Sequence, residues 1–229
     1  MLNAKSLLDS LVGGLGQVTG GQGAKGLTDK AKATWNNQST LGKGAIAGGL
    51  LGILLTGGGR RMLGTGLKIG GMAAIGGMAY KAYEDWKAGR SGGDAPALPA
   101  PEGSAFNPGA DGAADDLATR LLQAMIAAAK ADGHVSPEER AAIDGQLGNL
   151  GLGDEATALI AAELDAPLDV GRIAELSRNE AEATQIYAAT LLVVNEQSPA
   201  EKGYLAMLAA RMNLQQGLVD RLHAEAARL

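Results

Sequence analysis

Apolar residues recur at helical spacing throughout the second half of the chain. The first clear stripe is formed by Leu117, Leu121 and Met125, at intervals of one helical turn. Later stripes are formed by Ile186, Leu191 and Val194, by Leu205, Leu208 and Met212, and by Leu218 and Leu222. No strand-like alternation of apolar and polar positions stands between them. We therefore predict that residues 114–229 form an all-α domain, a bundle of about seven helices joined by small turns.

The beginning of the chain has a weaker helical pattern. Residues 1–43 form a Gly-rich, basic region, and a group of leucines and valine at helical spacing predicts a short amphipathic helix there (Leu7, Leu8, Leu11, Val12 and Leu15). The apolar patch is brief and Asp9 interrupts it, which is not typical of a secretory signal peptide.

Residues 44–87 carry a membrane signal. The stretch from Gly44 to Gly59 has no charged residue, Arg60 and Arg61 follow, and a second apolar run extends from Met62 to Tyr80 with Lys68 inside it. A spanning helix needs about 20 predominantly apolar residues. We expect one span or a tight hairpin here, with Tyr80, Tyr83 and Trp86 in an interfacial aromatic belt. A buried soluble hairpin and a disordered linker are the alternatives.

The glycines of this segment recur every fourth residue. Gly44, Gly48 and Gly52 would share one face of a helix, and such faces allow two helices to approach closely in lipid. In water, each glycine inside a helix costs about 1 kcal/mol relative to alanine. The pattern therefore predicts a homo-oligomer that forms through the Gly-rich segment in the lipid bilayer.

Composition changes this picture only slightly. Residues 88–113 are rich in Pro, Ala and Gly and are expected to be a linker. The chain has no cysteine, which excludes disulfides, thiolate metal sites and cysteine nucleophiles. A formal net charge of −5 argues against nucleic acid as the main partner. The aromatic content of 3% favours packed helices over a β-sandwich.

Two similar stretches could carry chemistry. The segments ADGHVSPEER, from Ala131, and NEQSPAEKGY, from Asn195, each contain Ser-Pro-x-Glu and resemble two halves of a degenerate repeat. Serine at the N-cap, proline at the first helical position and glutamate at the third form a capping box. Helix initiation is thus a sufficient explanation of both motifs.

The alternative is a site for a divalent cation. Asp132, Glu138 and Glu139 place carboxylates on a short loop around His134, and hard cations prefer several oxygen ligands. The second stretch would add a half-site from Asn195 and Glu201 if the two units face each other. The spacing is not that of an EF-hand. No cofactor is otherwise indicated, and no nucleophile, triad or phosphate loop predicts catalysis, so we expect no enzymatic activity.

The segments AMIAAAKADGHVSPEERAAI (Ala124 to Ile143) and AEKGYLAMLAARMNL (Ala200 to Leu214) resemble the TerB-like (tellurite resistance) helical domain. Together with the Gly-rich apolar segment and the Pro/Ala linker, they resemble the YebE-type inner membrane proteins of Gram-negative bacteria. This resemblance implies an all-α fold, residence in the inner membrane and a link to envelope or chemical stress. In TerB-like domains, acidic residues of the two halves are suspected metal ligands. They correspond here to Asp132, Glu139 and Glu201, whereas Asn195 replaces the expected fourth acidic residue.

Two functions are consistent with these observations. The first is a non-enzymatic scaffold or sensor, anchored in the inner membrane, with a cytoplasmic C-terminal domain that binds an unknown protein partner. The second is a metal-ion-binding module linked to tellurite or metal resistance.

Overall fold

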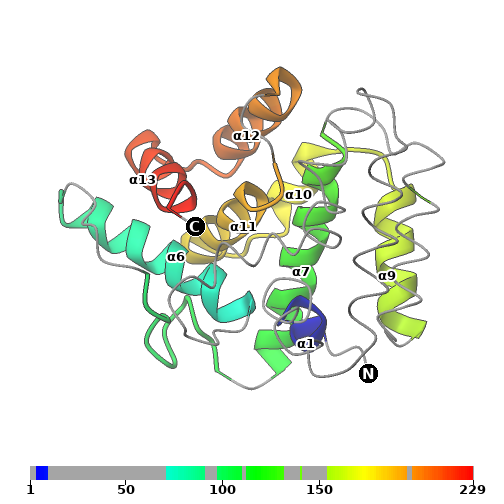
Figure 1. Ribbon diagram of the computed structural model, residues 1–229, viewed down its shortest axis with the longest axis horizontal. Helices are drawn as coiled ribbons and strands as arrows, with labels where there is room; N and C mark the ends of the chain where they lie inside the picture. Colours follow the sequence, from blue (N-terminus) through cyan, green and yellow to red (C-terminus); the bar gives the residue numbers. More distant parts are fainter. Residues whose placement is uncertain are drawn as a thin grey trace, which may run out of the picture.

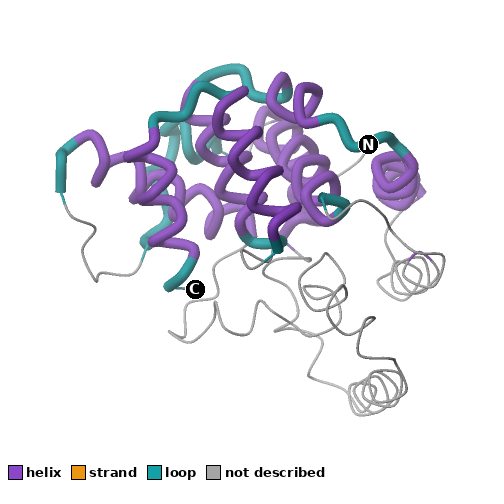
Figure 2. The backbone as a smooth tube through the Cα atoms, turned by 90° about the horizontal axis from the view of Figure 1, so that it is seen from above, coloured by secondary structure: helices purple, strands orange, loops and turns teal. Residues whose placement is uncertain are grey.

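The computed structural model describes residues 4–9, 71–90, 97–109, 112–131, 140, 154–194 and 198–228. Every regular element in these ranges is a helix, and no strand occurs among them (Figures 1 and 2). The helices are α1 (Ala4–Leu8), α6 (Gly71–Lys87), α7 (Gly112–Ala129), α9 (Asp154–Asp165), α10 (Val170–Glu175), α11 (Glu180–Leu191), α12 (Pro199–Arg211) and α13 (Gln216–Ala226). The prediction of an all-α fold is confirmed for this part of the chain.

Helix α11 lies at the centre of the molecule. Every residue from Ala183 to Leu191 is buried, because α6, α7, α12 and α13 all pack around this helix (Figure 1). The buried hydroxyls of Thr184 and Thr190 donate to carbonyl oxygens one turn earlier, at 2.7 and 2.8 Å, so both hydroxyls have a hydrogen-bond partner. Asn179 begins the helix by accepting from the Glu182 N–H.

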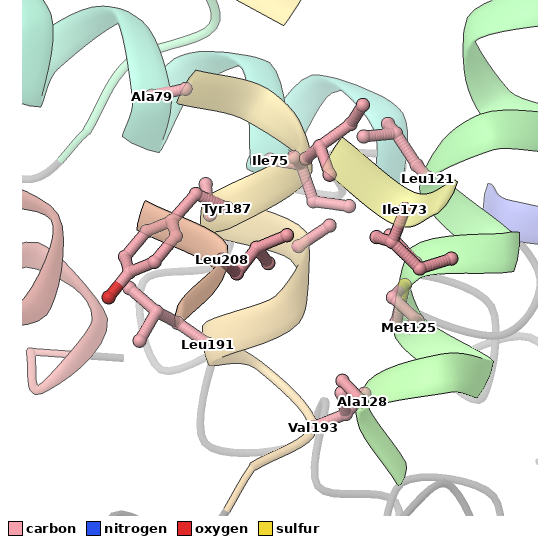
Figure 3. Close-up of a cluster of buried hydrophobic side chains, with 14 of the residues drawn as sticks. Ile75, Ala79, Leu121, Met125, Ala128, Ile173, Tyr187, Leu191, Val193 and Leu208 are labelled. Carbon is pink, nitrogen blue, oxygen red and sulfur yellow. The ribbon is translucent and has the colours of Figure 1, made fainter. Parts of the chain in front are cut away.

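The apolar stripe of α7 faces α11 and α9. Leu117, Leu121 and Met125 are all buried, as their spacing predicted, and Figure 3 shows Leu121 and Met125 beside Ile173 of α10. Alanines fill the rest of the interface and allow the helices to approach closely. The predicted stripes on α12 and α13 are buried as well, through Leu205, Leu208, Leu218 and Leu222.

Helix α1 lies near the start of the chain and includes Leu8 of the predicted amphipathic helix, whereas Leu11, Val12 and Leu15 lie outside the described residues. Ala4 and Leu8 are buried against α7. The Lys5 N–H donates to the Asp115 carboxylate at 2.9 Å, and Asp9 accepts from the Met72 N–H at 2.9 Å. Asp9 thereby stabilises the beginning of α6, since carboxylates are favourable at helix N-termini.

Helix α6 packs in the protein body, although the sequence predicted that its residues belong to a membrane segment. Residues 71–87 pack against α11 and α13, and the apolar face of the helix, with Ile75, Met78 and Ala82, is buried in the protein core. The helical body therefore begins well before residue 114. No helix in the described part of the chain combines the length and apolarity that crossing a bilayer requires. Gly44, Gly48, Gly52 and the rest of the segment up to residue 70 lie outside the described residues.

The residues 97–109, here called the 97–109 segment, pack along α6. A Cβ at Gly76 would lie 2.4 Å from the Phe106 carbonyl oxygen, and one at Gly77 would lie 2.5 Å from that of Leu98. The two glycines are thus explained by a close approach of backbone to helix. The Gln185 side chain donates to the Ala105 carbonyl at 3.1 Å and fixes the same segment to α11. This part of the predicted linker has no helix but is packed on the body.

The aromatic residues expected at a membrane interface contact protein instead. The rings of Tyr80 and Tyr83 lie 5.7 and 5.3 Å from the ring of Phe106. Trp86 packs at 5.8 Å from Tyr83 and lies against Gly217 of α13. These protein contacts account for the three aromatic side chains, and their place in an interfacial belt stays a prediction. The pattern of apolar and aromatic residues is the same for a helix end in lipid and one covered by protein.

Candidate functional site

The five predicted cation ligands are only partly described. Asp132, Glu138, Glu139 and Asn195 lie outside the described residues, whereas Glu201 is buried in the first turn of α12. Among the residues that the structure places, no three His, Asp or Glu side chains gather in a way that could hold a metal ion. The divalent-cation site therefore stays a prediction.

The second Ser-Pro-x-Glu motif begins a helix. Ser198 is the N-cap of α12 and accepts from the Glu201 N–H at 3.4 Å, and Pro199 occupies the first turn. The capping interpretation is confirmed at this motif. The first motif, at Ser136, lies in the undescribed interval 132–139.

The residues on either side of that interval are both bound to the end of α9. The Lys130 ammonium donates to the carbonyl oxygens of Glu163 (2.7 Å), Leu164 (3.3 Å) and Ala166 (2.5 Å). A cation is favourable here because the last carbonyls of a helix carry partial negative charge. On the far side of the interval, Arg140 donates to the Asp165 carboxylate at 2.5 Å. Lys130 and Arg140, which flank the undescribed interval, thus both contact the C-terminal end of α9.

Lys130 belongs to a cluster of polar side chains, which also includes Glu163, Arg172 and Tyr204. The Arg172 guanidinium of α10 donates to both carboxylate oxygens of Glu163, which is itself 4% exposed. Burial lowers the pKa of Lys130, although the Glu163 carboxylate acts against this and the Arg172 guanidinium adds to it. Burial, and after it the Glu163 carboxylate, raise the pKa of Tyr204 on α12. The cluster joins α7, α9, α10 and α12.

This cluster was not predicted from the sequence. Lys130 is the last residue of the Ala-rich stretch AMIAAAK, and the sequence alone indicates an ordinary lysine exposed to solvent. Glu163, nine residues before Arg172, lies on a different helix, so no spacing rule joins the two. A charged residue directly after an uninterrupted apolar run was the one available signal.

A groove of about 490 Å³ lies between α12 and α13. Tyr187 of α11 forms part of the groove lining. Figure 3 shows the Tyr187 hydroxyl pointing away from the buried hydrophobic side chains. That hydroxyl is hydrogen-bonded to Nε2 of His223 at 2.9 Å. Neither residue was singled out as a ligand from the sequence, where His223 reads as a lone surface histidine.

The sequence profile of the family described as "Protein of unknown function (DUF533)" matches residues 40–226 and so covers most of the chain. The chain belongs to the DUF533 family. This family is that of the TerB-like and YebE-type proteins, so the resemblance is confirmed at family level. The narrower YebE-type assignment and the membrane location stay predictions.

A relative of this DUF533 protein is the "Uncharacterized protein in ampR 5'region" of Yersinia enterocolitica. The two are 29% identical over 111 residues, which span 48% of this chain and 80% of the relative. No solved structure matches the chain. The comparisons therefore establish the family, and a proposal for the function has to rest on the structure.

Proposed function

We propose that this DUF533 protein is a non-enzymatic scaffold or sensor attached to the bacterial inner membrane, with a cytoplasmic helical body that binds a protein partner. The observation that carries the proposal is the position of α6. The uncharged run Gly44 to Gly59 and the apolar residues after it lead to Gly71 without any proline-rich interval. An attachment through residues 44–70 would therefore be joined to the helical body directly.

Helix α6 is held firmly in that body. Its Lys81 ammonium lies 2.5 Å from the Glu225 carboxylate of α13, and both side chains are largely buried. The 97–109 segment covers its glycine face. These contacts support a body held close to the bilayer in a defined orientation, whereas a flexible tether would let it move freely.

The cluster of Lys130, Glu163 and Arg172 supports a structural role. Lys130, Glu163 and Arg172 bind one another or the end of α9, and these contacts join helices. A general base or nucleophile instead needs a neighbour placed to take its proton beside an accessible pocket. The proposal remains one of binding and positioning.

Flotation of the full-length protein with vesicles of phosphatidylethanolamine and phosphatidylglycerol tests the attachment. We expect the protein to float with lipid. A double substitution, Leu51→Asp with Leu54→Asp, should leave it at the bottom of the gradient, because each buried carboxylate costs about 2.5–3.5 kcal/mol in a bilayer. Leu98→Asp is the control, since Leu98 is exposed on the body. A wild-type protein that never floats would refute the proposal.

The cation-binding hypothesis is the second candidate. It is favoured by one observation: Lys130 and Arg140, the described residues before and after Asp132, Glu138 and Glu139 in the sequence, both contact the end of α9. Calorimetric titration of the full chain with Ca²⁺, Mg²⁺ and Zn²⁺ separates the two functions. Binding heat that Asp132→Asn and Glu139→Gln remove would favour the metal-binding module, and its absence would leave the scaffold.

A further inference from the structure

The groove between α12 and α13 is apolar along most of its length. Three alanines of α12, Ala206, Ala209 and Ala210, line one wall, and Leu214 and Val219 line the other side. Alanine is too short to fill the space between two helices, which leaves the hollow open. Its volume of about 490 Å³ lies within the range of small-molecule sites.

The charged side chain of the groove, that of Lys202, lies at the end remote from the α12–α13 connection. Lys202 stands eight residues before Ala210 on α12, which corresponds to about 12 Å along a helix. The end beyond Ala210 is the connection from α12 to α13, where Leu214 lies. His223 lies seven residues after Gln216, so it too is far from the connection. Lys202 and His223 therefore both lie away from the connection, on the α12 and α13 walls of the groove.

The charge of the groove is positive. Lys202 is the one formally charged side chain among the lining residues, none of which is a carboxylate. Within the described residues Lys202 is exposed and forms no ion pair. Gln216 does not alter this, because its amide donates to Asp220 on the exposed side of α13 at 2.8 Å.

We propose that this groove binds a medium-chain alkyl carboxylate, with the carboxylate at Lys202 and the alkyl chain along the alanines of α12. The Lys202 ammonium supplies charge complementarity. The Tyr187–His223 hydrogen bond adds a polar surface to the α13 wall of the groove. The alkyl chain replaces water against the apolar walls, which is favourable in proportion to the area covered. This inference goes beyond the proposed function and does not depend on attachment to a membrane.

Photoaffinity labelling tests the proposal on the full-length protein. The probe is decanoate with a diazirine on its alkyl chain, and the labelled peptides are identified by mass spectrometry. Samples with and without phosphatidylcholine nanodiscs make the result independent of flotation. We expect saturable labelling on α12 and α13 in both. Labelling spread over the chain, or confined to other helices, would overturn the proposal.

Competition defines the ligand chemistry. Unlabelled decanoate should compete about five-fold better than decanol, because one partly exposed ion pair contributes up to about 1 kcal/mol. Lys202→Gln should abolish that difference while labelling by decanol-type probes persists. Equal competition by decanol, or stronger competition by phosphatidylglycerol vesicles than by decanoate, would refute a carboxylate ligand.

A blocking substitution supplies the structural control. Ala206→Trp places a large side chain in the groove from an exposed position, so labelling should fall about ten-fold without loss of the fold. Ala224→Trp makes the same change on α13 at an exposed residue outside the groove lining. It should leave labelling unchanged. A decrease of the same size in both variants would show that the labelled site is not this groove.

Discussion

The Lys81 ammonium on α6 and the Glu225 carboxylate on α13 lie 2.5 Å apart, and only 15% and 6% of these side chains are exposed. This ion pair joins residues 144 positions apart. Asp85 lies 3.2 Å from the same ammonium, and Arg228 donates to the same carboxylate at 2.6 Å. The pair thus joins α6 to α13, the last helix of the described body.

Lys81→Met should lower the free energy of unfolding by about 1–3 kcal/mol, because it leaves a buried carboxylate with one cation fewer. Arg228 remains beside Glu225, which keeps the loss below that of a wholly unpaired buried charge. Urea denaturation followed by circular dichroism measures the change. Lys202→Met is the matched control and should alter stability by less than about 0.5 kcal/mol, since Lys202 is exposed.

Gly76→Ala and Gly77→Ala should each destabilise the protein, although alanine is the better helix former by about 1 kcal/mol. The added methyl would overlap a carbonyl oxygen of the 97–109 segment, and such overpacking costs about 1–3 kcal/mol. Gly203→Ala on α12 is the control, because nothing lies within 4 Å of its added Cβ. It should raise the thermal midpoint. Stabilisation by all three would show that the 97–109 segment does not touch α6.

Tyr204→Phe should leave stability unchanged or raise it by up to about 1 kcal/mol at neutral pH, because the removed hydroxyl is buried with no hydrogen-bond partner among the described residues. Tyr187→Phe, the control, removes a hydroxyl that is bound to His223 and should be destabilising by about 1 kcal/mol. Chemical denaturation of both variants decides the matter. A larger loss in Tyr204→Phe than in Tyr187→Phe would contradict the packing described.

The same variant should alter the pH dependence. The pKa of Tyr204 is raised in the folded protein above its ordinary value of 10.0, so the unfolded chain loses that proton first as the pH rises. Wild-type stability should therefore fall above about pH 10, and the advantage of Tyr204→Phe should grow there. If the stability of the wild type and that of Tyr204→Phe changed equally with pH, this would count against a buried phenol.

Ser198→Ala should cost about 1 kcal/mol of stability, because the serine hydroxyl accepts from the Glu201 N–H at the start of α12. Gln215 stands at the N-cap of α13 but forms no side-chain capping bond. Gln215→Ala is therefore a control that should have almost no effect. Thermal unfolding of both variants checks the difference.

Local rules predicted much of the helical body. The spacing of Leu117, Leu121 and Met125 gave a buried stripe on α7, and Ser198-Pro199 marked the first turn of α12, because both signals act within a few residues. Helix α6 could not be assigned in the same way. Glycines and apolar residues at helical spacing suit a lipid environment and a close protein contact equally well, and only the partner across Gly76 decides between them.

The candidate sites were harder to predict for the same reason. Lys130 binds backbone carbonyls, which no residue pattern reveals. The α12–α13 groove is lined by two consecutive helices and by Tyr187 of α11, and α13 is placed by its packing against α6. Side chains that meet only through tertiary contacts leave no trace in the spacing of a single sequence.

The contact between α6 and the 97–109 segment has a consequence for how related chains can vary. Two neighbouring glycines oppose two carbonyl oxygens, at Leu98 and Phe106, so the backbone between those residues must have the right length to reach both. An inserted or deleted residue there would shift one oxygen away from its glycine. Length changes among homologues should therefore be absent between positions 98 and 106 and accumulate elsewhere along the chain.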